Sequence, residues 1–402
     1  MRSRKNEYIL TKQEVHDDAC SWLGPALRLE YKGRSCTDQV LLRILLLAAA
    51  RVVSVFAACE GLADAPTSAT VFNALYAAVP AMAELERRLN RALVAKVPRA
   101  LRRKSRIVAI DLTLIPYHGQ PALDKKEIYR SKAKSGTTKF HAYATAYVVH
   151  NGHRYTLALL HVEYGECMKE VVQRLLAIVR RRDVKIRYLL LDKGFFSVSV
   201  LSYLKRAGHG FIIPAMVRGR KKKDPQAPLT GLRALLKKKN GYYRQKLEGK
   251  REKKKISTSV TICVASKDYV HERTGKKHRK RLLYAIHRVR MTPPDIREIY
   301  RRRFGIESSY RQMNEARIKT CARDPRLRLL FVGIALVLRN VWVWIHFRFA
   351  RGKHGPEPQL FLALLRFRQM LNWITQVVQH ELGAAKSLGL DLDTYMRVRA
   401  GG

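Results

Sequence analysis

Residues 139–162, KFHAYATAYVVHNGHRYTLALLHV, form two alternating runs joined by Asn151-Gly152. Asn-Gly between two such runs is the strongest short-range signal for a two-residue β-hairpin. An apolar run precedes the hairpin, and helical and strand-like patterns alternate after it. The predicted elements are a strand at 106–116, the hairpin, a helix at 168–182, a strand at 186–194, a helix at 198–207 and a strand at 210–216. This order predicts a mixed sheet with helices, an α/β core.

Apolar residues recur at helical spacing through 40–58 and again through 69–78, so residues 1–100 are expected to be helical. The stretch between these two runs, EGLADAPTSAT, has the composition of a turn. Two interpretations remain open: a helix–turn–helix that binds DNA ends, or a helical hairpin that packs on the main body. We divide the rest into a first core part (101–215), a basic β-rich insertion (216–290), a second core part (291–350) and a C-terminal helical region with a proposed role in dimerisation (351–402).

Positive charge is in large excess, with 79 Lys and Arg against 32 Asp and Glu, a formal net charge of +47. The insertion at 216–290 alone holds 25 basic and 5 acidic residues. Such a surplus favours a polyanionic partner, and double-stranded DNA is the first candidate. An anionic membrane is the second. The apolar runs at 40–59 and 329–338 are too short or too interrupted for a spanning helix, so we expect no membrane partner.

Six cysteines are scattered, and no Cys-x-x-Cys pair occurs. They are typical of reduced thiols in a cytosolic protein, and they argue against a zinc site. The N-terminal stretch MRSRKNEYIL lacks the apolar core of a signal peptide. We therefore expect a cytoplasmic, nucleoid-associated protein.

Three acids stand out by their context. Asp111 interrupts an apolar strand, Asp192 ends the apolar run YLLLD, and Glu307 lies among arginines in a late helix that begins near Thr292. Desolvating an unpaired carboxylate is costly, and acids projecting together would repel one another without a cation between them. Carboxylate oxygens suit Mg²⁺, and such a set can hold the two ions used in phosphoryl transfer. Each acid also has a structural alternative: a polar cluster for Asp111, a turn for Asp192, and ion pairs with Arg303 and Arg311 for Glu307.

The stretches AIDLTLIPYHG, LLLDKGFFS and YRRRFGIESSYRQ resemble the DDE transposases of bacterial insertion sequences, in the group with a Tyr-Arg-Glu-Lys signature. Tyr300, Arg303 and Glu307 match this signature in register, whereas Asn314 stands where the family has Lys. The resemblance implies a ribonuclease H-like core interrupted by a β-rich insertion, with Asp111, Asp192 and Glu307 as catalytic metal ligands. It further implies DNA contacts from a set of polar residues: Lys193, Tyr300, Arg301, Arg302, Arg303, Arg311, Asn314, Arg317 and Lys319.

The implied reaction is cut-and-paste transposition: cleavage of transposon ends with two Mg²⁺ ions, for which Mn²⁺ is expected to substitute, and strand transfer into target DNA. In related transposases the ends pass through a hairpin, and an aromatic residue of the insertion stacks on a flipped base. Here Tyr242, Tyr243, Tyr269 and Tyr284 are the candidates, because all four tryptophans lie elsewhere. Cutting two ends together implies a homodimer on DNA. The alternatives are a non-catalytic DNA-binding protein derived from a transposase and a nuclease that cuts without joining.

Overall fold

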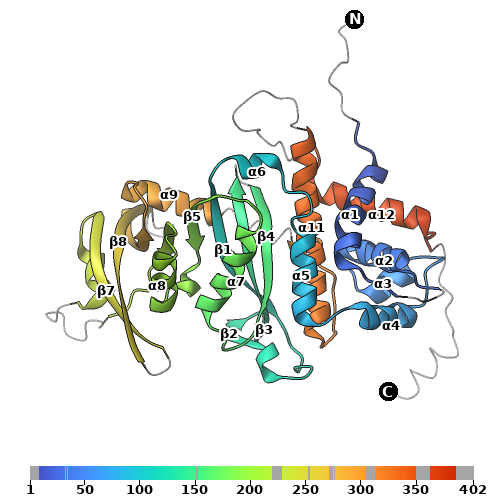
Figure 1. Ribbon diagram of the computed structural model, residues 1–402, viewed down its shortest axis with the longest axis horizontal. Helices are drawn as coiled ribbons and strands as arrows, with labels where there is room; N and C mark the ends of the chain where they lie inside the picture. The colour runs from blue at the N-terminus through green and yellow to red at the C-terminus, as the bar shows by residue number, and fades with distance from the viewer. Residues whose placement is uncertain are drawn as a thin grey trace, which may run out of the picture.

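The computed structural model describes residues 9–31, 33, 35–150, 153–219, 229–251, 254–270, 275, 277–304, 313–349 and 363–385. Its sheet lies at one end and a body of helices at the other, with one long helix between them (Figure 1). The chain has the mixed α/β architecture that the order of patterns predicts.

The predicted helical character of the N-terminal region is confirmed, but its first helix is not continuous. Val52 adopts a left-handed conformation (φ 57°) and ends the helix, and Ser54 begins another by accepting a 3.1 Å hydrogen bond from the Ala57 N–H. Apolar spacing runs through this break, which is why periodicity alone missed it. The helices are α1 (Lys12–Leu27), α2 (Asp38–Arg51), α3 (Val55–Glu60), α4 (Ser68–Ala78), α5 (Met82–Ala92) and α6 (Arg99–Arg103).

Within the described residues, nine strands form one sheet. Eight of them lie in the order β2-β3-β1-β5-β6-β9-β8-β7, and the ninth, β4, also pairs with β3. The predicted hairpin is confirmed, because β3 and β4 pair antiparallel. Its two turn residues, 151 and 152, lie outside the described ranges. β5 is parallel to β1 and β6, and the other neighbouring strands are antiparallel. The strands of the first core part are β1 (Arg106–Pro116), β2 (Tyr129–Lys134), β3 (Thr137–His150), β4 (His153–Val162), β5 (Ile186–Leu191) and β6 (Phe211–Pro214).

The insertion contains strands, as predicted, but they do not form a separate sheet. β9 (Lys277–His287) pairs with β6 over four residues, and β8 (Lys254–Val270) and β7 (Gly241–Arg251) continue outward from it. The hydrogen bonding of the core therefore runs without interruption into the insertion. A short 3₁₀ helix, Gly231–Lys237, precedes β7.

Helices cover both faces of the sheet, which explains the continuous apolar run of β5. Leu189 and Leu191 face α7 (Met168–Arg180) and α8 (Val198–Arg206), whereas Leu190 faces α9 (Pro293–Phe304). As expected from the sequence, Thr292 caps α9: its hydroxyl accepts a 3.4 Å hydrogen bond from the Asp295 N–H.

The long helix α11 (Pro325–Phe349) lies between the sheet and the helical body (Figure 1). By length and composition it could cross a membrane, but 94% of its most apolar window is buried inside the protein. This apolar stretch is thus part of the protein core. Trp342 lies in the core, with its indole N–H donating to the Leu365 carbonyl at 2.7 Å.

The outer edge of β4 is hydrogen-bonded by side chains instead of a further strand. Asn340 of α11 accepts from the Thr156 N–H at 2.9 Å and donates to the Thr156 carbonyl at 2.7 Å. Asn90 of α5 does the same for Leu159, at 2.8 and 2.7 Å. These bonds satisfy buried backbone groups on an edge strand and fix the two helices against the sheet.

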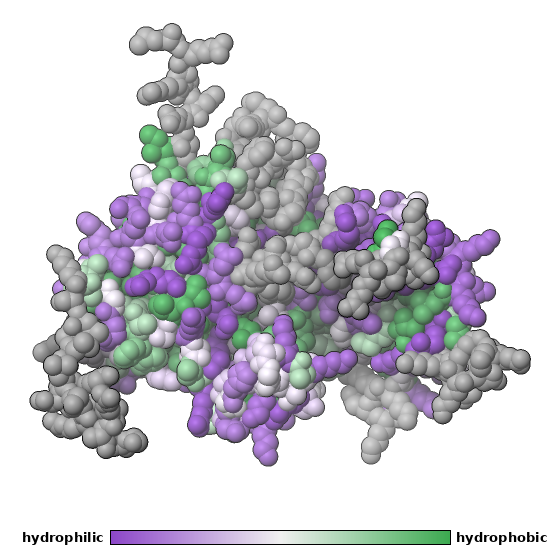
Figure 2. Space-filling view, turned by 180° about the vertical axis from the view of Figure 1, so that it is seen from behind, coloured by the Kyte–Doolittle hydropathy of each residue, from purple (hydrophilic) through white to green (hydrophobic). Residues whose placement is uncertain are grey.

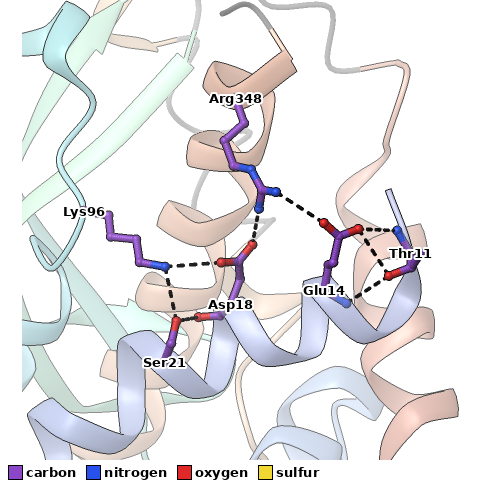
Figure 3. A network of polar contacts seen from close by, with 6 residues as sticks. All are labelled: Thr11, Glu14, Asp18, Ser21, Lys96 and Arg348. Carbon is purple, nitrogen blue, oxygen red and sulfur yellow. Dashed lines mark hydrogen bonds and ion pairs between the residues drawn. The ribbon is translucent and has the colours of Figure 1, made fainter. Parts of the chain in front are cut away.

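The C-terminal helix α12 (Phe367–Glu381) packs against α1 and α2, so it belongs to the N-terminal helical body. Residues 351–362 of the predicted C-terminal helical region lie outside the described part, and the helix begins at Phe367. Figure 3 shows how this body is tied to α11: Arg348 bonds Asp18 at 2.6 Å and Glu14 at 3.5 Å, and Lys96 reaches Asp18 at 3.2 Å. From behind, hydrophilic side chains spread over both ends of the molecule (Figure 2).

Candidate active site

Asp111 and Asp192 project from neighbouring parallel strands at the same level. Ile110 of β1 pairs with Leu191 of β5, so each acid directly follows a paired residue. Side chains alternate along a strand, which places Asp111 on the face of Ala109 and Asp192 on the face of Leu190, both toward α9. The carboxyl end of β5 is also where ligands bind in sheets of this kind.

Arg303, near the end of α9, lies between the two acids. Its Nη1 is 3.4 Å from Oδ2 of Asp111, and its Nη2 donates a 3.0 Å hydrogen bond to Oδ1 of Asp192. The Arg303 side chain is 6% exposed, against 15% for Asp111 and 41% for Asp192. One buried guanidinium therefore bridges two carboxylates that come from strands 81 residues apart in sequence.

The electrostatics of the site depend on this bridge. Burial raises the pKa of the Asp111 carboxyl, Arg303 and Arg154 oppose that rise, and the neighbouring Asp192 adds to it. Burial works against the charged form of Arg303, but Tyr300 and the two carboxylates leave the pKa of its guanidinium raised. Two carboxylates this close need a cation between them, and in this structure the cation is Arg303.

Tyr300 determines where α9 lies on the sheet. Its side chain is buried, and its hydroxyl donates to the Leu191 carbonyl at 3.2 Å, one residue before Asp192. Its ring packs on Tyr284 of β9 at 5.3 Å between centroids. Here Tyr300 positions Arg303 beside the acids, and its DNA contact stays a prediction.

The remaining predicted DNA contacts lie mainly on the surface. Lys193, Arg301, Asn314 and Lys319 are exposed, and Arg301 pairs with Glu298 on its own helix at 3.0 Å. Arg317 is half-buried and donates to the Asn314 side chain at 3.3 Å. Glu307 and Arg311 lie outside the described residues, as does the side chain of Arg302, so the structure says nothing about where they are.

The sequence reasoning missed one basic residue of the site, Arg154 of β4. It is 2% exposed, stacks on the Tyr147 ring at 3.7 Å and donates to the Thr145 hydroxyl at 2.7 Å. Thr145 pairs with Asp111 across β1 and β3, so Arg154 supports the acid from behind. The sequence did contain a signal for this residue: Arg154 is a charged residue within the alternating run that follows Asn151-Gly152.

The donor set fits a divalent cation, although it is not complete in the described part of the chain. No three His, Cys, Asp or Glu side chains gather there in a metal-binding arrangement. Asp111 and Asp192 nevertheless offer adjacent carboxylate oxygens, the ligands that Mg²⁺ and Mn²⁺ prefer, in a place already built for positive charge.

Comparison with known proteins supplies independent information. A family model described as the transposase DDE domain matches residues 102–341. No curated protein matched the chain. Among solved structures, the fold is similar to that in the cryo-EM structure of the piggyBac transposase synaptic complex with hairpin DNA, with a TM-score of 0.51 and 11% sequence identity. The match covers 100% of this chain and 86% of that one, and it supports a ribonuclease H-like fold.

Proposed function

The chain belongs to the transposase DDE domain family and is a DNA transposase, and on this basis we propose that it cuts transposon ends and joins them to target DNA. DDE transposases generally use divalent metal ions. We propose Mg²⁺, with Mn²⁺ as a substitute, held by Asp111, Asp192 and Glu307. The observation that carries the proposal is the parallel register of β1 and β5, which aligns the two aspartates beside one buried arginine.

The acids have a direct chemical role in this proposal. When bound, two divalent ions would stabilise the attacking and leaving oxygens of an in-line displacement at phosphorus. In end cleavage, water attacks a phosphodiester and the bond to the 3′ oxygen breaks. In strand transfer, that 3′-OH attacks a target phosphodiester and a new bond to phosphorus replaces the old one.

Basic residues around the acids would bind and orient the DNA. Lys193 follows Asp192 directly and is exposed, and Arg301 is exposed on α9. A guanidinium or ammonium group at these positions can bind phosphate oxygens without reading bases. Arg303 would turn from the two carboxylates to a phosphate when a metal takes its place, because the same group cannot serve both at once.

We also propose where the enzyme acts, its oligomeric state on DNA, and which tyrosines would stack on a flipped base. The enzyme would act in the cytoplasm as a homodimer on double-stranded DNA, since two ends must be cut together. If the ends form hairpins, Tyr242 and Tyr269 are the better stacking candidates, at 47% and 41% exposed, whereas Tyr284 is buried.

A cleavage and joining assay tests the proposal. A labelled duplex with the DNA sequences that flank the gene, searched first for short inverted repeats, is incubated with full-length protein and Mg²⁺, and nicked and joined products are measured. Asp111→Asn and Asp192→Asn should each abolish both steps while the DNA is still bound. The alternative, a DNA-binding protein without catalysis, is favoured by Asn314 in place of the signature Lys. It would be supported if the wild type bound these ends but never nicked them in Mg²⁺ or Mn²⁺.

A further inference from the structure

A loop between β1 and β2, residues 117–128, presents an apolar side chain at its tip. Leu123 is 96% exposed, and no other large apolar side chain in the described part of the chain is as exposed. The loop lies at the end of the core away from α6, beside β2 (Figure 1). Single exposed apolar side chains are common on protein surfaces, so a role for Leu123 depends on the loop that presents it and on the charge beside it.

The loop is held in shape by its own hydrogen bonds. The carboxylate of Glu127, 8% exposed, accepts from the backbone N–H groups of Ala122 at 2.8 Å, Leu123 at 3.2 Å and Asp124 at 3.2 Å. At the start of the loop, the buried Tyr117 donates from its hydroxyl to the Gln120 carbonyl at 2.7 Å. Leu123 is thus presented by a preorganised backbone, so binding through it would cost little ordering entropy.

The loop and β2 are strongly positive, although the exposed Glu163 lies beside them, because the Tyr164 N–H donates to the Lys126 carbonyl at 2.8 Å. Residues 117–139 contain six Lys and Arg and only two acids. Both acids are used within the loop: Glu127 holds its backbone, and Asp124 accepts from the Lys126 N–H at 2.8 Å. Lys139 is half-buried. The other five basic side chains are exposed: Lys125, Lys126, Arg130, Lys132 and Lys134. An apolar tip within a basic surface is complementary to a DNA duplex, with its stacked bases and charged backbone.

The loop also lies on the catalytic edge of the sheet. β1 pairs with β5 only as far as Ile110 and then continues to Pro116, beyond the level of the two aspartates. The loop that carries Leu123 therefore follows β1 on the side of the sheet toward which the strand runs past Asp111 and Asp192.

We propose that Leu123 is a wedge that inserts between adjacent base pairs of bound DNA, to one side of the phosphate held at Asp111 and Asp192. The proposal rests on the proposed function, since it places DNA on the catalytic edge. Insertion unstacks one base step and bends the duplex, and phosphate contacts from the surrounding lysines offset that cost. The wedge would fix where along the duplex the scissile phosphate falls.

Fluorescent base analogues test the wedge directly. Duplexes with the DNA sequence that flanks the gene carry a single 2-aminopurine at successive positions, and the fluorescence of this base rises on unstacking. Full-length wild type should give one maximum, at a base step to one side of the cleaved phosphate, and Leu123→Ala should lose at least about half of that rise. Leu123→Met, which keeps an apolar side chain of similar size, should retain it. The matched control is Val270→Ala, which removes an apolar side chain 57% exposed at the end of β8 and should change nothing.

The outcomes separate the two proposals. A fluorescence maximum that is unchanged in Leu123→Ala overturns the wedge. The wedge is also overturned if Leu123→Ala changes only the oligomeric state measured by light scattering, because Leu123 would then contact a second copy of the chain. A wild type that cleaves ends without any Leu123-dependent maximum overturns the wedge alone. A Leu123-dependent maximum in a wild type that never cleaves supports the wedge and overturns the catalytic function.

Discussion

Arg303 donates a 3.0 Å hydrogen bond to Asp192, joining the end of α9 to the end of β5. The same guanidinium approaches Asp111 at 3.4 Å. It therefore occupies the place between the two carboxylates that a metal ion would need. Loading the site with metal and releasing Arg303 are then linked equilibria, and the first prediction follows from this competition.

Arg303→Gln should tighten Mn²⁺ binding to the DNA-free protein about tenfold, because the ion no longer competes with a guanidinium. The variant should also melt at a lower temperature without metal and regain stability when Mn²⁺ is added, since the two carboxylates lose their cation. Mn²⁺ titration followed by electron paramagnetic resonance gives the affinity, and calorimetry gives the melting temperature.

The control for this prediction is Arg301→Gln, which removes the same charge from an exposed position on the same helix. It should leave Mn²⁺ affinity nearly unchanged. Equal tightening in both variants would mean that net charge, and not the bridge, controls metal binding.

Asn340→Leu should destabilise the protein by about 3 kcal/mol, because it leaves the Thr156 N–H and carbonyl and the Leu93 carbonyl without their partner. Urea unfolding of both proteins gives the difference. Asn73→Leu changes an exposed asparagine of α4 and should cost less than about 0.5 kcal/mol. A loss at position 340 as small as this would show that the edge of β4 does not depend on these bonds.

His141 should make the fold sensitive to acid. Burial, with Arg328 and His161 nearby, lowers the pKa of its ring to about 3. In the unfolded chain the ring takes up a proton near pH 6.5, so stability falls as the pH drops below that value and until the folded pKa is reached. Between pH 7 and pH 5 this residue alone should cost about 2 kcal/mol.

His141→Leu should remove that part of the pH dependence, measured as the difference in unfolding free energy between the two pH values. His118→Leu, at an exposed position, should leave it intact. An unchanged slope in His141→Leu would mean that other groups carry the acid sensitivity.

Tyr242→Ala should impair hairpin formation more than the first nick. The ring is exposed and lines a cavity of about 450 Å³ with His287 and Arg288, and its hydroxyl donates to the Met291 carbonyl. Losing a stacked base costs about 1–3 kcal/mol, so hairpin product should fall by roughly tenfold to a hundredfold. Denaturing gels separate nicked strands from hairpins.

Two further variants test which tyrosine stacks on the base. Tyr242→Phe keeps the ring and should retain most hairpin product. Tyr269, the other exposed candidate, does not line this cavity, so Tyr269→Ala should leave hairpin product unchanged if Tyr242 is the stacking residue. A loss that is equal for Tyr269→Ala would place the stacking elsewhere in the insertion.

Local patterns were enough to predict the elements that carry the site. Asn151-Gly152 and the runs beside it predicted the β3–β4 hairpin, because side-chain alternation and turn chemistry are properties of neighbouring residues. Thr292 marked the start of α9 for the same reason. The helix break at Val52 was not predicted, because apolar spacing continues through this left-handed residue and its conformation is decided by packing.

The sequence by itself determined the strand and helix order, the acids that interrupt apolar runs, and a positive charge that favours a polyanionic partner. Only the tertiary structure decided that the insertion extends the core sheet, that Arg154 supports Asp111, and that Arg303 lies between Asp111 and Asp192. The physical reason is the separation in sequence over which each kind of interaction acts. Periodicity and capping act over a few residues, whereas a guanidinium 111 residues from Asp192 reaches it only because strand register and helix packing bring both to one place.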